Sequence, residues 1–269
     1  MVCWTVSLIF YFLSIRGEAA DGKVRISFFN VGYGDAILIQ LPDEETVLID
    51  AGPEESSEIL FDDLAAAGVK SITRAVLTHP HDNHFGGYPL LLSRFVPQVF
   101  YTNGDDLRAD PGYAEIIRGL QEKAVAVKTL RRGDIISLQD PQAKLEVLYP
   151  ESLNDSVNGS ALVLLFHYGV VSILLTSDIE PDQQEELINL EPGLNIVNVV
   201  QVPHHGGDLS PQFTRFFKSR IYVVSTGMNP YGKPQMKDLA RLHGRILRTD
   251  ERNGVTFLTD GRIVSIVDE

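Results

Sequence analysis

Residues 78–87 read Thr-His-Pro-His-Asp-Asn-His-Phe-Gly-Gly and place three histidines, His79, His81 and His84, within six positions. The segment ends a short apolar run, Ala75–Thr78, that predicts a buried strand. A turn at this strand end can point His79 and His81 to one side, while His84 serves a neighbouring position. Imidazole is a preferred ligand of divalent cations, and strand-end loops hold several such ligands rigidly. The segment therefore predicts a metal site.

A histidine pair follows another predicted strand, Asn195–Val202, in the sequence Pro-His-His-Gly-Gly at 203–207. The glycines allow the backbone to turn tightly next to a ligand. Beside the first cluster, His204 and His205 become candidate ligands. The two remaining histidines have no such neighbours, and we expect structural or surface roles for them; they are His167 and His243.

Two aspartates also end predicted strands. Asp178 closes Leu-Leu-Thr-Ser-Asp at 174–178, and its two oxygens point apart, so it can bridge two cations. The alternative is a cap on the helix predicted at Pro181–Asn189. Asp50 closes Val-Leu-Ile-Asp at 47–50, where the alternative is an aspartate that forms a turn.

The flanking segments predict a layered α/β domain, because a strand-rich first half precedes strands that alternate with helices. Ligands of such domains bind at strand ends. The predicted strands are Val24–Val31, Ala36–Leu41, Thr46–Asp50, Ala75–Thr78, Gln98–Thr102, Leu145–Tyr149, Ala161–Tyr168, Val171–Thr176, Asn195–Val202, Ile221–Ser225, Arg245–Arg248, Val255–Thr259 and Ile263–Val267. The predicted helices are Ser56–Ala67, Tyr88–Phe95, Tyr113–Lys123, Pro181–Asn189, Pro211–Lys218 and Gln235–Leu242.

Composition narrows the class of protein. The chain has 269 residues, of which 44% are hydrophobic and 22% charged, and this excludes a disordered chain, a fibre and a polytopic membrane protein. A formal net charge of -13 argues against tight non-specific binding to nucleic acid, although metal ions can still bridge to phosphates. The single cysteine rules out an internal disulfide and a thiolate zinc site.

The N-terminus carries the longest apolar run, Val2–Ile15, followed by small residues at Ala19 and Ala20. Fourteen residues are too few to span a bilayer comfortably as a helix. The pattern predicts a signal peptide over residues 1–20 and a single domain over 21–269, hence a secreted or periplasmic protein. An uncleaved membrane anchor is the alternative.

Together these residues resemble the metallo-β-lactamase superfamily, and in particular the hydrolase domain of the ComEC competence proteins and its stand-alone relatives. The resemblance covers nearly everything after the predicted signal peptide. The matching segments are FFNVGYGDA at 28–36, LIDAG at 48–52, THPHDNHFGG at 78–87, NGSALV at 158–163, LTSD at 175–178, PHHGG at 203–207 and NPYGKP at 229–234.

The resemblance implies an αββα four-layer sandwich, with two mixed sheets inside and helices outside. It also implies two metal sites that share a bridging carboxylate. Their ligands would be His79, His81 and Asp178 in one site, and His84, His205 and Asp178 in the other. His204 is the alternative ligand or a substrate contact. We expect one or two Zn²⁺ ions. Mn²⁺ is the alternative, because all donors are nitrogen or oxygen and no sulfur ligand favours zinc strongly.

Two positions depart from the family pattern. Asn83 stands where the family has an aspartate that binds the second metal, and a neutral amide is a poorer ligand. Asp82 is adjacent, but it substitutes only if the loop backbone shifts, because successive side chains point differently. Lys233 replaces a late histidine and can bind phosphate as a cation instead. Asn83 joins Asp178, His84 and His204 in the set expected to carry catalysis.

The resemblance predicts a metal-dependent hydrolase that attacks phosphodiesters, DNA among them, with a metal-activated water. The substrate would be a small-molecule or nucleic-acid phosphodiester; no membrane channel is expected in this chain, and no obligate protein partner is inferred. Two alternatives stay open, because one fold supports many chemistries. They are a hydrolase of another ester or lactone, and a degenerate protein that binds metal or ligand without turnover.

Overall fold

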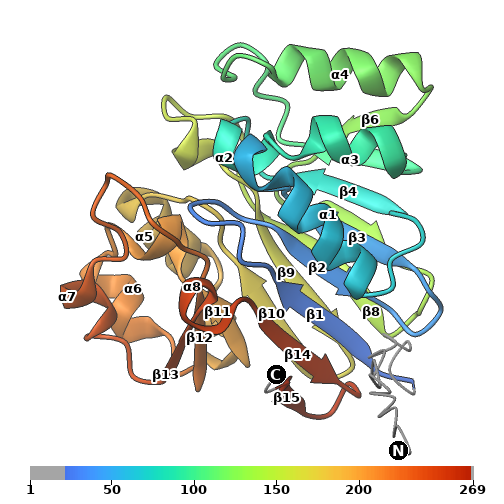
Figure 1. Ribbon diagram of the computed structural model, residues 1–269. Coiled ribbons are helices and arrows are strands. Elements are labelled where there is room, and N and C mark those ends of the chain that lie inside the picture. Colours follow the sequence, from blue (N-terminus) through green and yellow to red (C-terminus); the bar gives the residue numbers. More distant parts are fainter. Residues whose placement is uncertain (1–21, 268–269) are drawn as a thin grey trace, which may run out of the picture.

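Two mixed β-sheets pack face to face, and helices cover the outer face of each, as the computed structural model shows (Figure 1). The structure describes residues 22–267, so the predicted signal peptide lies outside the described residues. The four layers confirm the expected αββα sandwich.

The first sheet has eight strands in the order β15-β14-β1-β2-β3-β4-β5-β6. Strands β3 to β6 are parallel, and the other neighbours are antiparallel. The bounds are β1 (Val24–Phe28), β2 (Ile37–Gln40), β3 (Thr46–Ile49), β4 (Arg74–Leu77), β5 (Val99–Thr102), β6 (Ala126–Thr129), β14 (Val255–Thr259) and β15 (Val264–Val267).

The second sheet has seven strands in the order β13-β12-β11-β10-β9-β8-β7. Strands β10 to β13 are parallel, and β7 to β10 are antiparallel. The bounds are β7 (Ile135–Ser137), β8 (Ala143–Tyr149), β9 (Val163–Tyr168), β10 (Val171–Leu175), β11 (Val199–Gln201), β12 (Ile221–Val224) and β13 (Arg245–Arg248).

The helices divide between the two outer faces. Buried residues of α1 (Ser57–Ala66), α3 (Tyr88–Arg94) and α4 (Tyr113–Glu122) pack on the first sheet, and those of α5 (Pro181–Leu190), α6 (Pro211–Phe216) and α7 (Met236–Leu239) pack on the second. Between residues 22 and 267, no helix has the length and apolar character needed to cross a bilayer. The shorter elements are α2 (Asp82–Phe85), α8 (Thr249–Arg252), η1 (Glu54–Ser56), η2 (Asn158–Ser160), η3 (Pro192–Ile196) and η4 (Pro203–Gly206).

Alternation along the strands separates the layers. In β2, Ile37 and Ile39 face the core between the sheets, while Leu38 faces the helices. In β10, Ile173 faces the same inner core and Leu174 faces α5 and α6. Because side chains alternate across a strand, a strand covered on both faces is apolar throughout. This explains why the central strands read as continuous apolar runs.

The structure differs from the predicted elements mainly at strand ends and sheet edges. Two edge strands, β6 and β7, were not predicted, because most of their side chains are exposed and their sequences lack an apolar run. The strand predicted at Asn195–Val202 begins only at Val199, since Pro192–Ile196 forms η3. The first strand ends at Phe28, three residues before the predicted end.

Candidate metal centre

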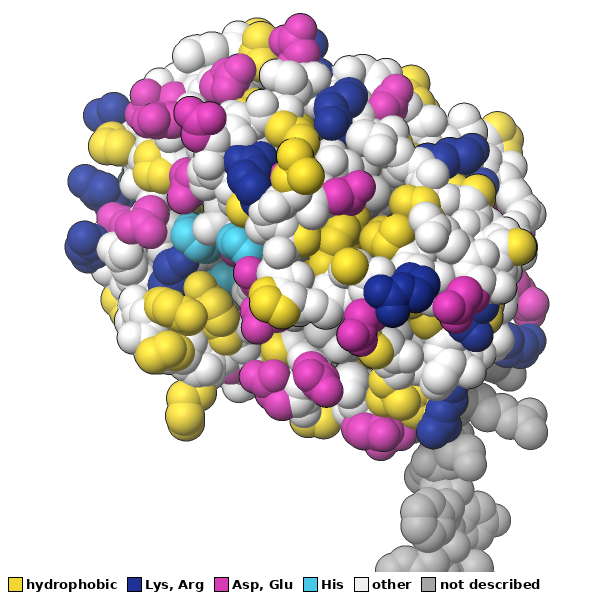
Figure 2. Space-filling view, turned by 90° about the horizontal axis from the view of Figure 1, so that it is seen from above, with side chains coloured by type: hydrophobic (Ala, Val, Ile, Leu, Met, Phe, Trp, Pro, Cys, Tyr) yellow, Lys and Arg dark blue, Asp and Glu magenta, His cyan; other side chains and the backbone are white. Residues whose placement is uncertain are grey.

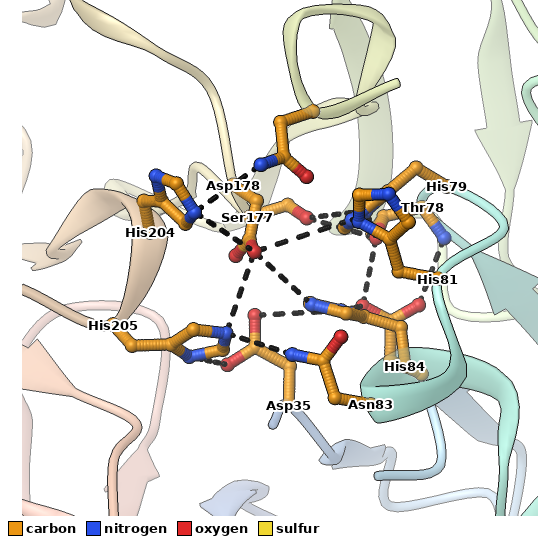
Figure 3. Close-up of polar contacts among 12 residues, drawn as sticks. Asp35, Thr78, His79, His81, Asn83, His84, Ser177, Asp178, His204 and His205 are labelled. Carbon is orange, nitrogen blue, oxygen red and sulfur yellow. Dashed lines mark hydrogen bonds and ion pairs between the residues drawn. The ribbon is translucent and has the colours of Figure 1, made fainter. Parts of the chain in front are cut away.

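The candidate residues converge at the carboxyl ends of four strands. Asp50 follows β3, His79 follows β4, Asp178 follows β10, and the His204–His205 pair follows β11. Parallel strands end at a common edge of their sheet, and the two packed sheets bring both edges together. Side chains that are far apart in the sequence therefore meet in one buried cluster (Figure 3).

The three histidines of residues 79–84 meet through a change of backbone direction. His81 is extended, with φ -92° and ψ 147°, and caps the one-turn helix α2, which returns His84 toward the strand end. Nε2 of His79 lies 3.1 Å from Nδ1 of His81. Ligand atoms of a tetrahedral zinc ion lie roughly 3.3 Å apart, given the usual bond lengths. His79 and His81 are thus spaced as two ligands of one cation.

Asp178 is the centre of the cluster. Its Oδ2 lies 3.4 Å from Nε2 of His84 and 3.4 Å from Nε2 of His205. The same oxygen is 3.9 Å from Nε2 of His204 and 4.0 Å from Nε2 of His79. A single carboxylate oxygen therefore faces four imidazoles, which is the arrangement expected of a bridging ligand.

The loop that carries Asp178 is fixed by its neighbours. Ser177 has a φ of 49°, a left-handed conformation that is uncommon outside glycine. The backbone N–H groups of Thr176 and Ser177 donate to Oε1 of Gln201, which stabilises this turn. The alternative role of Asp178 as a helix cap is not observed, because Glu180 occupies the N-cap position of α5.

Asp50 orients His84. Its Oδ2 accepts from Nδ1–H of His84 at 2.8 Å and from the hydroxyl of Thr78 at 2.8 Å, while Oδ1 accepts from the Thr78 backbone N–H. A carboxylate on Nδ1 fixes the ring and leaves Nε2 directed at the metal position. Asp50 also has a φ of 57°, so the predicted turn and the positioning role coincide.

Other imidazoles are anchored in the same way. Nδ1–H of His205 donates to the carbonyl of Ser225 at 3.0 Å. Nδ1 of His79 lies 3.1 Å from the hydroxyl of Thr78, whose own proton goes to Asp50. With Nδ1 bonded, Nε2 of both rings turns to the cluster, as cation ligation requires.

The adjacent histidines 204 and 205 occupy different positions. Both have left-handed backbone conformations, with φ of 51° and 57°, so their side chains diverge. His205 is almost fully buried and lies nearer to Asp178. Nε2 of His204 lies 3.2 Å from the Asn158 amide nitrogen, and its side chain is 14% exposed. His205 is therefore better placed as a ligand, and His204 is the more exposed of the two.

Asn83 points into the cluster, where its Nδ2 lies 3.1 Å from Nε2 of His205. An amide rotated about its last bond places oxygen at the same point, so Asn83 can offer a neutral oxygen there. Asp82 is exposed, and its backbone N–H donates to Asp110. The loop does not bring the Asp82 carboxylate into the place that Asn83 occupies.

Asp35 joins the cluster although its role was not predicted. Asp35 is 2% exposed, and its Oδ2 accepts a hydrogen bond from Nε2 of Gln201 at 2.8 Å. Its Oδ1 lies 3.9 Å from Nδ1 of His205, and its Oδ2 lies 4.0 Å from Nδ1 of His84. Its ligand atom groups with those of Asp178 and His205. The signal available in the sequence was the Gly-Tyr-Gly-Asp segment at 32–35, which the resemblance matched without assigning a role.

Burial and charge divide the imidazoles into two groups. Burial lowers the pKa of His79, and the nearby His84 lowers it further, so His79 is neutral. Burial also lowers the pKa of His81 and of His204. For His84 and His205, burial opposes protonation, but Asp178 outweighs it and raises the pKa of both.

The carboxylate itself is held in its charged form. Burial works against ionisation of Asp178, yet the neighbouring His205 and His84 hold its pKa well below the usual value. The centre of the cluster is thus a buried anion that attracts positive charge.

The donor set fits a divalent cation. Buried polar atoms normally have hydrogen-bond partners. Within residues 22–267, none is found for Oδ1 of Asp178, Oδ1 of Asp35 and Nδ1 of His204. These atoms accompany imidazoles and carboxylates, which are the ligands that zinc and manganese take. The assignment of each residue to one cation or the other stays a prediction.

The rim of the site combines a cation, aromatic rings and acids. Lys233 is half-buried, and burial lowers its pKa. Figure 2 shows a basic side chain and a group of hydrophobic side chains directly beside the imidazoles. A cavity of about 610 Å³ near the start of α5 has four carboxylates in its lining, those of Asp155, Glu180, Asp182 and Asp208. Away from the cluster, His167 faces Glu146 from β9, and His243 is exposed.

The fold and the buried histidine–aspartate cluster define the class as an αββα protein with a candidate metal site. The chain belongs to the metallo-β-lactamase superfamily, whose family model matches residues 29–227. The family and the buried cluster together define a metallo-β-lactamase-fold protein whose histidines and aspartates could hold a divalent cation.

Two curated relatives carry competence-system names. The chain is 28% identical to ComE operon protein 3 of Bacillus subtilis (strain 168) over 290 aligned residues, which cover 97% of this chain and 36% of the relative. It is 26% identical to competence protein ComA of Neisseria gonorrhoeae, with 94% of this chain and 35% of the relative covered. The chain thus spans about a third of the length of these relatives.

Solved structures support the fold alone, because their sequence identities are low. A diphosphatase of the PhnP family gives a TM-score of 0.54 at 14% identity and covers 91% of this chain and 100% of its own. CmlA, a diiron β-hydroxylase from Streptomyces venezuelae, gives 0.55 at 16% identity and covers 87% of this chain and 54% of its own. Such different chemistries show that the fold does not assign the substrate.

Proposed function

We propose that this protein is a metal-dependent phosphodiester hydrolase, with Zn²⁺ as its cation and Mn²⁺ as the alternative. The observation that carries the proposal is the Asp178 carboxylate, whose Oδ2 faces four imidazoles at 3.4–4.0 Å. In the reaction, a water oxygen bonds to phosphorus, the bond to the leaving alcohol oxygen breaks, and the water proton passes to the alcohol or to solvent.

The rim supports a phosphodiester as substrate. Among residues 22–267, no carboxylate oxygen lies within 4.0 Å of the Lys233 ammonium, so this half-buried cation is free to bind an anion. The carboxylates of the nearby cavity repel ligands with several negative charges, whereas a phosphodiester group carries a single negative charge. The competence names of the two relatives favour DNA as the source of that group.

The side chains have separate tasks in this reaction. A divalent cation bound at the cluster would activate water and offset charge on the phosphoryl oxygens. His79, His81 and Asp178 would hold one cation, and His84, His205 and Asp178 would hold a second. His204, the more exposed member of the 204–205 pair, would contact the substrate.

Asn83 favours one further candidate, a protein that binds metal or ligand without turnover. An amide in the cluster weakens the second metal position, and two-metal catalysis needs both positions. We favour activity because the remaining donors are present, and hydrogen bonds at Nδ1 hold the rings of His79, His84 and His205.

The decisive experiment compares metal content and hydrolysis of bis-p-nitrophenyl phosphate by the purified protein. The wild type should contain zinc and release p-nitrophenol. His81→Ala should lose metal and activity together, because a first ligand is removed. The matched control is His243→Ala, which alters an exposed histidine away from the cluster and should change neither. Full metal occupancy in His81→Ala would contradict the ligand assignment.

We also propose that the protein acts outside the cytoplasm. The support is the apolar run Val2–Ile15 with Ala19 and Ala20 behind it. The N-terminal sequence of secreted or periplasmic material should begin near Asp21. A protein found in the cytoplasm with Met1 intact would overturn this proposal, and an intact start in the membrane fraction would support the anchor.

A further inference from the structure

A row of aromatic rings leads from the candidate metal centre to the surface. The Tyr33 ring, in the loop between β1 and β2, lies 4.3 Å from the His205 ring, centroid to centroid. The Tyr231 ring, in the loop after β12, lies 5.1 Å from that of Tyr33 at an interplanar angle of 37°. Tyr231 is 67% exposed, so the row ends in a largely open ring.

A cation accompanies this row. Nζ of Lys233 lies 5.9 Å from the centroid of the Tyr33 ring. The aliphatic stem of Lys233 packs on Gly207, where a Cβ would approach its Cε to 2.6 Å. Because Gly207 follows the His204–Gly206 turn, the stem lies directly beside the loop that carries His205.

The loop of Tyr231 and Lys233 is fixed by one side chain. Oδ1 of Asn229 accepts from the backbone N–H groups of Tyr231 and Lys233, at 3.0 Å and 3.2 Å. Its Nδ2 donates to the carbonyls of Gly227 and Lys233. The backbone that carries the ring and the ammonium is therefore held in place before any ligand binds, which lowers the entropy cost of binding.

A solitary exposed tyrosine is common on protein surfaces and needs no ligand. Here the exposed ring is backed by a second ring that touches a candidate metal ligand, and a free cation lies alongside. Every nucleobase has a face that stacks on an aromatic side chain, and an ammonium binds phosphate. Lys233 is half-buried and interacts electrostatically with Asp178, whereas Tyr231 is largely exposed. From the cluster outwards the cation therefore precedes the open ring, as the phosphate precedes the base in a nucleotide.

We propose that Tyr231, backed by Tyr33, stacks the nucleobase of the nucleoside joined to the scissile phosphate, while Lys233 contacts that phosphate. This inference rests on the proposed function and deepens it, because it makes nucleotide phosphodiesters the preferred substrate class. Simple alkyl phosphodiesters reach the cluster but leave the Tyr231 face uncovered.

The test uses two substrates with the same leaving group, thymidine 5′-(p-nitrophenyl phosphate) and methyl p-nitrophenyl phosphate. Stacking of one base changes affinity by about five- to 150-fold. The wild type should prefer the thymidine substrate in kcat/KM by a factor in this range. Tyr231→Leu should bring the ratio toward one, and Tyr231→Phe should keep it. Met228→Ala, at a fully exposed position on the same loop, should also keep it.

A binding measurement tests the inference without turnover. Calorimetric titration should show that the wild type binds thymidine 5′-monophosphate more tightly than methyl phosphate, and that Tyr231→Leu removes the difference. Lys233→Gln should weaken both ligands. If the wild type hydrolyses neither substrate but shows this binding preference, the proposed function fails and the nucleotide site stands. The nucleotide site would be overturned if the wild type showed equal kcat/KM for the two substrates and equal affinity for the two ligands. It would also be overturned if Tyr231→Leu kept the preference for the thymidine compounds.

Discussion

Asp50→Asn tests whether the carboxylate behind His84 organises the metal centre. Asp50 is fully buried and accepts three hydrogen bonds, two from Thr78 and one from Nδ1–H of His84. An asparagine keeps one acceptor oxygen and presents an NH₂ group to at least one of these donors. The change removes a charge and leaves buried donors facing each other.

The structure sets the size of the effect. Each buried hydrogen-bonding group left without a partner costs about 1–3 kcal/mol. With one or two such groups in Asp50→Asn, the free energy of unfolding should fall by about 2–4 kcal/mol. Loss of a carboxylate that orients a ligand histidine also weakens metal binding by roughly 10–100-fold.

Urea unfolding measures the first effect, and competition with a chromophoric zinc chelator measures the second. The matched control is Asp62→Asn, which makes the same charge change at an exposed position on α1 and should alter stability by no more than about 0.5 kcal/mol. If Asp50→Asn matches this control in both measurements, Asp50 does not position His84 and the reasoning is refuted.

Two further changes test neighbouring parts of the centre. Asn83→Asp puts a carboxylate 3.1 Å from Nε2 of His205. Metal analysis should then give a zinc-to-protein ratio closer to two, and kinetics should show faster hydrolysis. An unchanged ratio and rate would indicate a degenerate second site. Gln201→Leu removes the side-chain hydrogen bonds of Gln201 to Asp35, Thr176 and Ser177. The free energy of unfolding should therefore fall by about 3 kcal/mol. A urea midpoint equal to that of the wild type would show that Gln201 does not stabilise the loop that carries Asp178.

The fold was predictable because apolar patterning and turn residues agree over most strands. The hairpin about Gly169 and the central parallel strands were identified correctly, since they are buried on both faces. The edge strands Ala126–Thr129 and Ile135–Ser137 escaped prediction because partner strands, rather than their own side chains, hold them in the sheet. Their sequences carry too few buried residues to signal a strand.

The candidate site was predictable where residues of one kind lie close together in the sequence. The histidine clusters at 79–84 and 204–205 are visible in the sequence, and the structure brings both groups to Asp178. Asp35 was missed because a lone acid in a turn has no sequence signature of its own. Its role depends on the long-range contact with Gln201, which only the packed sheets create.

The different roles of His204 and His205 could not be predicted without the three-dimensional structure. Two successive left-handed residues send His204 and His205 in different directions, and no sequence rule specifies such a turn for histidine. The contact between Tyr33 and Tyr231 likewise joins loops from two different sheets, almost 200 positions apart.

The central claim is that a cation held by the Asp178 cluster activates phosphodiester hydrolysis. The most direct test titrates Zn²⁺ into the metal-free full chain while hydrolysis of bis-p-nitrophenyl phosphate is recorded. We expect no hydrolysis without metal and a rate that rises with occupancy until the first tight site is filled, at about one equivalent. Stoichiometric zinc binding without hydrolysis, or hydrolysis that is independent of zinc, would contradict it.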